Sequence, residues 1–183
     1  MSSALSETVE LPRPVDIRPL TPSPGTRAAL VGLLRETVAH GGSVSFMHPL
    51  SQADAEAFWE KSLAAAARGE RVVLGAFDGE TLAGTVTLVL DLPVNQPHRA
   101  EIAKLMVALS HRGRGIASAL MNAAEARATA AGRTMLVLDT ASIDGAGGLY
   151  EGLGWTFAGE LPDYAYTPHG IMSGTRLYWK RLG

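Results

Sequence analysis

Apolar residues recur along this chain with two different spacings, which divide it into helices and strands. Spacings of three and four residues predict helices over 26–38, 52–67, 113–131 and 146–153. Short runs rich in apolar and β-branched residues predict strands over 15–20, 71–77, 81–90, 99–107, 134–138, 155–159 and 171–180. The elements therefore follow the order β-α-α-β-β-β-α-β-α-β-β, and the chain contains no internal repeat.

Turn and capping residues support these boundaries. Asp78-Gly79 between two strand-like runs is a strong hairpin signal, Ser51 is a candidate N-cap, and Gly41 follows the first helix. Strands that follow one another directly are expected to pair antiparallel, whereas the strand–helix–strand unit from 99 to 138 should pair parallel through a right-handed crossover. The predicted fold class is therefore α/β, with a mixed, mostly antiparallel sheet of six or seven strands and helices on both faces.

Length, charge and composition narrow the functional classes. The 183 residues suit one domain, which we place at 15–183 after a loose N-terminal segment over 1–14. The net charge of -2 gives no electrostatic case for nucleic acid or an anionic membrane. Cysteine is absent, which excludes disulfides and a thiol nucleophile, and the five histidines are too dispersed to indicate a metal site. Without a signal peptide or an apolar run of ~20 residues, we expect a soluble, cytoplasmic protein.

The strand over 99–107 runs into a glycine-containing loop that opens the next helix. Glycines let a backbone approach a ligand closely, and the unpaired N–H groups and dipole of a helix N-terminus favour an anion such as a pyrophosphate. Arg112 and Arg114 could add positive charge. The spacing is that of neither a Walker loop nor a Rossmann fingerprint, and a solvated turn before a helix is the alternative. The candidate ligand-binding residues are Leu105, Met106, Val107, Arg112, Gly113, Arg114, Gly115, Ile116 and Ala117.

Two motifs carry a resemblance to a known family. Arg112-x-x-Gly115-x-Ala117 resembles the acyl-CoA pyrophosphate loop of the GNAT superfamily of N-acyltransferases. Leu149-Tyr150-x-x-Leu153-Gly154-Trp155 resembles the Leu-Tyr-x-x-Leu-Gly-Phe element of that family, with Trp in place of Phe. The resemblance implies the GNAT fold and acetyl-CoA as acyl donor. One departure is Ile143, which stands where many members carry an Asn that contacts the cofactor.

A closer resemblance links four stretches to the tabtoxin-resistance acetyltransferases, which acetylate the amino group of a β-lactam amino-acid toxin. The stretches are 36–47, 99–107, 138–140 and 159–164. This resemblance implies a small-molecule amine as acceptor. The alternatives are acetylation of a protein lysine or N-terminus, and a non-catalytic acyl-CoA-binding module; an RNA-binding role lacks a basic, aromatic stripe. The sequence leaves a homodimer open.

The family resemblance also implies where the chemistry takes place. The strand over 101–107 would separate from the strand near 134–139 and hold the pantetheine through the backbone of Met106 and Val107, with an N–H group stabilising the oxyanion. Tyr150 is the candidate acid for the leaving thiolate, since a phenol (pKa about 10) and a thiol (about 8.5) have similar acidity. The alternative is that Tyr150 only packs under the preceding strand.

Two carboxylates are candidates for contact with the amine. Asp139 and Glu101 would either accept its proton, through a raised pKa or a water, or only orient the ammonium group. The alternatives are a strand-end cap for Asp139 and a surface charge opposite Arg99 for Glu101. The candidate acceptor-binding residues are Gly42, Ser43, Phe46 and Met47 on one side and Tyr164 on the other, although Phe46 and Met47 would also suit a core.

Overall fold

The helices and strands occur in the order that the sequence predicts. The computed structural model describes residues 15–183, so the expected loose segment over 1–14 lies outside the described residues. The elements are β1 (Asp16–Pro19), α1 (Pro24–Ala39), α2 (Gln52–Ala67), β2 (Arg71–Asp78), β3 (Thr81–Val89), β4 (Arg99–Val107), η1 (Leu109–His111), α3 (Ile116–Ala130), β5 (Met135–Ala141), η2 (Ser142–Asp144), α4 (Gly147–Gly152), β6 (Thr156–Tyr166) and β7 (Met172–Arg181). The short turns η1 and η2 are 3-10 helices.

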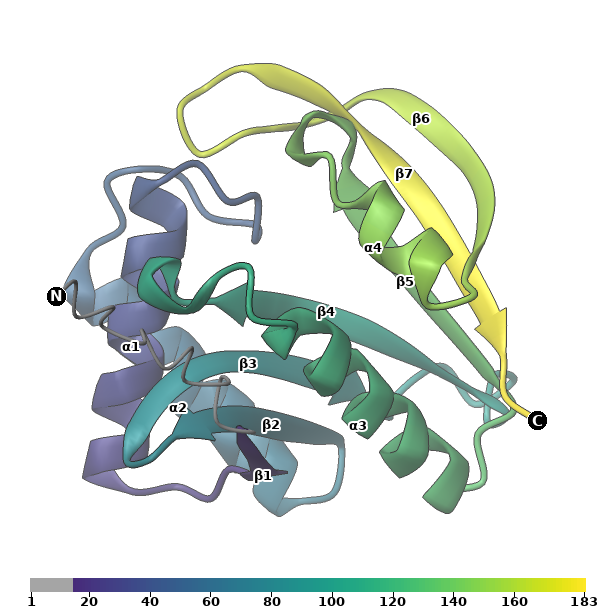
Figure 1. The fold of residues 1–183 in the computed structure, drawn as a ribbon, viewed down its shortest axis with the longest axis horizontal. Coiled ribbons are helices and arrows are strands. Elements are labelled where there is room, and N and C mark those ends of the chain that lie inside the picture. Colours follow the sequence, from purple (N-terminus) through teal and green to yellow (C-terminus); the bar gives the residue numbers. More distant parts are fainter. Residues whose placement is uncertain (1–14) are drawn as a thin grey trace, which may run out of the picture.

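The strands form one seven-stranded sheet in the order β1-β2-β3-β4-β5-β7-β6 (Figure 1). Every neighbouring pair is antiparallel except β4 and β5, which run parallel because α3 connects them as a crossover. The predicted mixed, mostly antiparallel sheet is therefore confirmed, with seven strands. The parallel pair lies in the middle of the sheet.

Helices cover both faces of the sheet and bury two cores. In Figure 1, α3 lies on one face of β2, β3 and β4, whereas α1 and α2 lie on the other. Leu74 on β2 and Leu120 on α3 belong to one apolar cluster, and the adjacent Val73 belongs to the other, with Leu34 of α1 and Trp59 of α2. The alternation along β2 follows from the period of two in a strand. No helix within 15–183 combines the length and apolarity that crossing a bilayer requires.

Local chemistry explains where the first two helices begin. Ser51 caps α2 as predicted, because its Oγ accepts from the backbone N–H of Asp54 at 3.0 Å. The first helix begins two residues earlier than predicted, at Pro24. The hydroxyl of Ser23 caps it by accepting from the N–H of Thr26 at 3.0 Å, and a proline suits the first turn, where its missing N–H needs no partner.

The largest departure from the sequence prediction is β6. We expected a strand over 155–159 and then a loop, because Pro162 cannot donate to a ladder. The strand continues to Tyr166. It tolerates Pro162 because it is an edge strand that pairs only with β7, and its register shifts between Leu161 and Ala165.

Candidate active site

The strands β4 and β5 are paired at one end and separate at the other. The parallel ladder consists of Arg99 with Met135, Ala100 with Leu136 and Glu101 with Val137. Beyond it, β4 stays with β3 while β5 stays with β7 as far as Ala141. From Ile102 onward, the edge of β4 that faces β5 therefore has no strand partner within the described chain. Backbone N–H and C=O groups require partners, so this edge can bind an extended ligand in place of a strand.

A β-bulge lies within this free segment of β4. Thr85 pairs with Met106 and Thr87 with Ala103, so one residue of β3 stands opposite two residues of β4, Lys104 and Leu105. Lys104 adopts a left-handed backbone conformation with φ 53°. A bulge redirects side chains and twists a strand locally, and bulges of this kind are frequent next to active sites.

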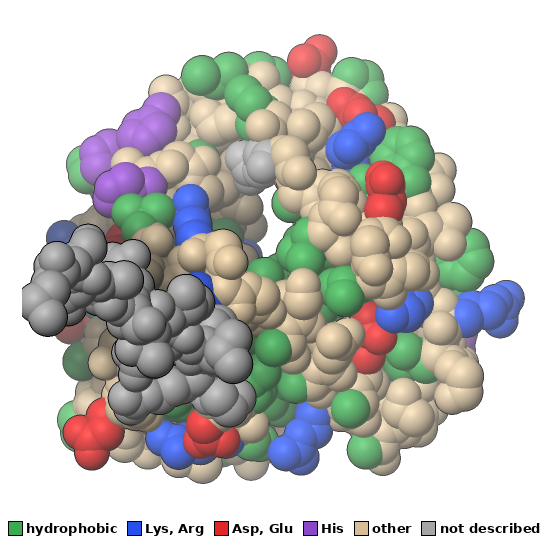
Figure 2. Space-filling model, viewed as in Figure 1, with side chains coloured by type: hydrophobic (Ala, Val, Ile, Leu, Met, Phe, Trp, Pro, Cys, Tyr) green, Lys and Arg blue, Asp and Glu red, His purple; other side chains and the backbone are tan. Residues whose placement is uncertain are grey.

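The separation of the two strands opens a cavity of about 540 Å³. Figure 2 shows it as a hollow near the middle of the face that is turned to the viewer. Five parts of the chain enclose it: the segment after α1, the free half of β4, the loop that leads into α3 with the start of that helix, the end of β5, and the start of α4. Among its lining residues are His40, Gly41, Gly42, Ser43, Val44, Ser45, Lys104, Leu105, Met106, Val107, Arg112, Ala117, Asp139, Thr140 and Tyr150. The volume suits a small-molecule ligand.

The predicted anion loop has the geometry that phosphate binding needs. Gly113 and Gly115 both have positive φ, 73° and 75°, a conformation that disfavours residues with a Cβ. Gly115 is the N-cap of α3 and no side chain caps that helix, so its first N–H groups are available to a ligand. An added Cβ at either glycine would meet no atom within 4 Å, so the loop is open to its surroundings.

The two arginines of this loop have different environments. Arg112 lines the cavity, with its Nε 3.4 Å from the carbonyl oxygen of Val107. Arg114 instead forms an ion pair with Asp78 at 2.9 Å, and His111 Nε2 lies 3.5 Å from the same carboxylate. Arg114 thus anchors the loop to the β2–β3 hairpin, and Arg112 is the arginine that faces the ligand space.

Tyr150 both packs among other aromatic rings and lines the cavity. Its side chain is 6% exposed and packs at 5.5 Å from the ring of Tyr178 and 6.3 Å from that of Trp155. It also lines the cavity, from α4. Packing in the aromatic cluster and access to the ligand space are therefore compatible in this side chain.

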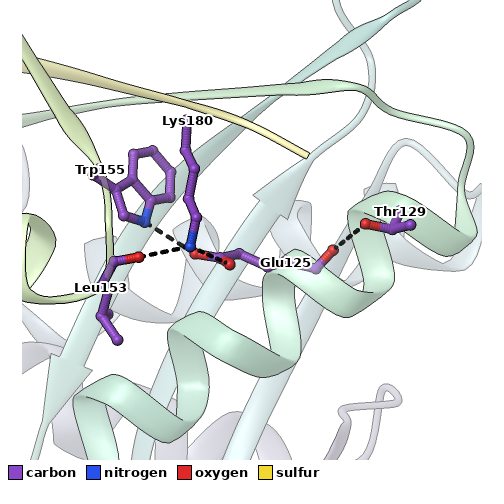
Figure 3. A network of polar contacts seen from close by, with 5 residues as sticks. All are labelled: Glu125, Thr129, Leu153, Trp155 and Lys180. Carbon is purple, nitrogen blue, oxygen red and sulfur yellow. Dashed lines mark hydrogen bonds and ion pairs between the residues drawn. The ribbon is translucent and has the colours of Figure 1, made fainter. Parts of the chain in front are cut away.

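A polar network holds α4 and the start of β6 against α3 (Figure 3). The carboxylate of Glu125 accepts from the indole N–H of Trp155 at 3.0 Å and from the ammonium of Lys180 at 2.7 Å. Lys180 also donates to the carbonyl of Leu153 at 2.6 Å. The indole N–H gives a physical reason for Trp where the family motif has Phe, since a phenyl ring could not donate to Glu125. Because Glu125 and Lys180 lie far in sequence from Leu153 and Trp155, the motif alone did not reveal this network.

The structure separates the two candidate carboxylates. Asp139 lines the cavity on β5 and accepts from the hydroxyl of Thr175 at 3.2 Å. Glu101 lies where β4 and β5 are still paired, forms an ion pair with Arg99 at 2.8 Å and does not line the cavity. The expectation that both carboxylates face one cleft is wrong for Glu101, because the strands diverge only after it.

The structure places two of the five candidate acceptor-binding residues at the cavity. Gly42 and Ser43 line the cavity, whereas Phe46 packs on Phe58 with ring centroids 5.2 Å apart. Met47 and Tyr164 are 51% and 57% exposed and do not line the cavity. Phe46 and Met47 therefore form no part of the cavity lining. Phe46 instead extends the core between α1 and α2.

The β6–β7 hairpin nevertheless reaches the segment after α1, through residues that the sequence did not single out. The backbone N–H of His48 donates to the carbonyl of Pro168 at 2.9 Å. The ring of His48 lies 5.0 Å from that of His169, whose Nε2 is 3.2 Å from the carbonyl of Ala39. These contacts join the hairpin to the segment that borders the cavity.

Ile143 and Lys104 have contrasting positions relative to the cavity. Ile143, which replaces the Asn of many family members, is exposed on η2 and offers no polar group. Lys104 lines the cavity. The sequence analysis did not predict this position, because no local sequence signal indicates the β-bulge in β4. Burial lowers the pKa of Lys104, Asp139 opposes that effect, and Arg71 adds to it.

Comparison with known proteins identifies a family and several solved structures to which this chain is similar. The family described as Acetyltransferase (GNAT) family matches residues 39–155, more than half of the chain. An N-acetyltransferase from Staphylococcus aureus Mu50 shares the fold, with a TM-score of 0.77, 20% identity and coverage of 92% of this chain and 99% of that one. A ribosomal-protein-alanine N-acetyltransferase from Brucella melitensis has a TM-score of 0.76, 19% identity and coverage of 91% and 99%.

A third similar structure contains a ligand. The phosphinothricin acetyltransferase from Sinorhizobium meliloti, solved in complex with acetyl-CoA, has a TM-score of 0.77 at 19% identity and covers 93% of this chain and 90% of its own. At these identities the structural likeness establishes the fold, and the family match establishes the relationship. The chain belongs to the GNAT family of acetyltransferases and is an N-acyltransferase.

Proposed function

We propose that this chain transfers an acetyl group from acetyl-CoA to the amino group of a small molecule, by direct transfer in a ternary complex. The observation that carries the proposal is the cavity between β4 and β5, which brings Tyr150, Asp139 and the free edge of β4 to one space. The acceptor belongs to the class of toxins, antibiotics or amino-acid-like amines.

The residues present fit acetyl-CoA. The uncapped N-terminus of α3, with Gly113, Gly115 and Arg112, would hold the pyrophosphate. The unpaired edge of β4 at Met106 and Val107 would bond the pantetheine, as a further strand would. Acetyl-CoA supplies the acetyl group as a thioester when bound. A backbone N–H of the β4 bulge would donate to its carbonyl oxygen, where negative charge develops during transfer.

The remaining chemistry is proton movement. As the C–N bond forms and the thioester C–S bond breaks, the ammonium group of the acceptor loses two protons, and the departing sulfur gains one. Tyr150 would donate that proton through its phenol, which suits the similar acidities of phenol and thiol. Tyr150 would then regain one of the two protons that the ammonium group loses, and the other would pass to solvent. Asp139 would orient the ammonium group of the acceptor.

The acceptor side favours a small molecule over a peptide chain. The β6–β7 hairpin contacts the segment after α1 through His48, Pro168 and His169, and that segment borders the cavity. A peptide lying across the site would need a continuous open groove there. The fold itself does not discriminate, since the similar structures include both a phosphinothricin and a ribosomal-protein-alanine acetyltransferase.

Initial-rate kinetics test the direct transfer. The chain contains no cysteine to carry an acetyl group as a thioester, so we expect both substrates to be bound together when transfer occurs. When acetyl-CoA and amine concentrations are varied together, the double-reciprocal lines should intersect. Parallel lines, with an acetylated enzyme detected by mass spectrometry in the absence of amine, would rule out direct transfer.

Asp139→Asn should mainly impair use of the amine. Asparagine keeps the size and the oxygen that accepts from Thr175, but removes the negative charge that attracts an ammonium group. We expect KM for the amine to rise about tenfold or more while the Kd of acetyl-CoA stays within about twofold, as the loss of a charge-assisted hydrogen bond implies. A change confined to the Kd of acetyl-CoA would place Asp139 on the cofactor side. Glu101→Asn is the matched control, because that carboxylate lies outside the cavity.

A further inference from the structure

Lys104 is the basic side chain that the β4 bulge places at the cavity. The bulge makes Lys104 and Leu105 stand opposite one residue of β3, and Lys104 takes a left-handed backbone conformation with φ 53°. This conformation costs about 1–2 kcal/mol for a residue with a side chain, and such strain gathers at functional sites. Lys104 lines the cavity together with Asp139 and the glycine-containing segment after α1.

The ammonium group of Lys104 is incompletely paired. It carries three donors, and within residues 15–183 its one hydrogen bond runs to the hydroxyl of Ser45 at 3.2 Å. Its other close neighbour is the face of the Phe58 ring, 5.8 Å from Nζ. Among the described residues, no carboxylate lies within the 4.0 Å of an ion pair. Burial lowers its pKa, as expected for a cation that has lost water without gaining a counter-ion.

Charges around Lys104 are arranged to receive an anion. Asp139, on the facing strand, acts on Lys104 electrostatically but forms no ion pair with it. Arg71 acts on it with positive charge from β2. The two walls of the cavity thus offer opposite charges, a cation on β4 and a carboxylate on β5.

We propose that Lys104 binds an anionic group of the acceptor, so that the acceptor is an amino acid or a similar compound with a carboxylate beside its amine. The inference rests on the proposed function and deepens it. Asp139 attracts the ammonium group and Lys104 the carboxylate, which fixes the orientation of the acceptor toward the acetyl group. A lysine within a peptide has no such carboxylate, so the same pair of charges selects free amino acids over proteins.

The test compares matched acceptors that differ only in the anionic group. A set of free amino acids, including lysine, methionine and glutamine, is assayed beside the corresponding amino-acid amides, with acetyl-CoA saturating. For at least one pair, we expect kcat/KM for the acid to exceed that for the amide by about tenfold or more. Lys104→Met should reduce this ratio to about twofold by lowering the rate with the acid, and Lys104→Arg should restore part of it.

Two controls separate this role from a structural one. The Kd of acetyl-CoA should be unchanged in Lys104→Met, and Lys61→Met, at an exposed position on α2, should leave the acid-to-amide ratio as in the unaltered protein. Intact mass after incubation with acetyl-CoA checks that Lys104 keeps its charge. Stoichiometric acetylation of Lys104 would remove the cation and overturn the inference.

The outcomes for the inference and for the proposed function are distinct. Amides used as well as acids, or a preference for acids that persists in Lys104→Met, would overturn the role of Lys104 while leaving the enzyme a small-amine acetyltransferase. Turnover of polyamines or aminoglycosides, with neither amino acids nor their amides acetylated, would also overturn the role of Lys104 and leave the proposed function intact. The ratio in the unaltered protein decides the substrate class even if the Lys104 variants fail to fold.

Discussion

Gly115→Asp should abolish measurable binding of acetyl-CoA. Gly115 is the N-cap of α3 and stands at the uncapped helix end that would receive the pyrophosphate. An aspartate there fills the space over the N–H groups and brings a negative charge beside the phosphates. At a separation of about 4 Å and an effective dielectric constant of about 20, such repulsion is worth about 4 kcal/mol. We therefore expect the Kd, measured by calorimetry, to rise at least a hundredfold.

The matched control separates charge from backbone strain. Gly69, after α2, has φ 78° against 75° for Gly115, and an added Cβ would meet nothing within 4 Å at either position. Gly69→Asp therefore carries the same strain but lies outside the residues that line the cavity. It should bind acetyl-CoA normally. Unchanged affinity in Gly115→Asp would show that the phosphates bind elsewhere.

Tyr150→Phe should lower kcat about a hundredfold and change the Kd of acetyl-CoA little. General acid catalysis contributes about 10²–10⁴-fold, and phenylalanine keeps the ring that packs against Trp155 and Tyr178 while removing the proton donor. The measurement is kcat with both substrates saturating, beside calorimetry with acetyl-CoA. Because the hydroxyl is lost without a change of shape, a fall in kcat alone points to proton transfer.

Tyr178→Phe is the control for loss of a phenol in the same aromatic cluster. Tyr178 is fully buried, and its hydroxyl donates to Glu151 at 3.3 Å, but it does not line the cavity. Its removal should cost about 1 kcal/mol of folding stability and leave kcat nearly unchanged. If both variants retained the kcat of the unaltered protein, Tyr150 would have only a packing role.

The order of elements followed from the sequence because local signals marked most of them. Ser51 and its helix, the Asp78-Gly79 hairpin and the strand over 99–107 all lie where they were predicted. The length of β6 was not predictable in the same way. Pro162 is a local signal against a strand, and only the place of β6 at the edge of the sheet makes it tolerable.

Site residues that belong to a sequence motif were predictable. Site residues whose position depends on the pairing of strands in the sheet were not. Gly115 and Tyr150 belong to motifs, and their environments suit the expected chemistry. Glu101 and Asp139 looked equivalent, and the point at which β4 leaves β5 separates them. The position of Lys104 at the cavity depends on a bulge that arises only where β4 pairs with β3. It could therefore not be inferred from the residues next to Lys104 in the sequence.

The most direct test of the account is release of free thiol from acetyl-CoA against a panel of amines. The panel contains β-lactam and ordinary amino acids, aminoglycosides, polyamines and a lysine peptide, and mass spectrometry verifies an equal amount of acetylated product. The account predicts turnover with at least one class of small amine and a much lower rate with the peptide. Turnover with the peptide alone would contradict it. So would a complete lack of thiol release with every amine of the panel, if acetyl-CoA still raised the Tm of the protein.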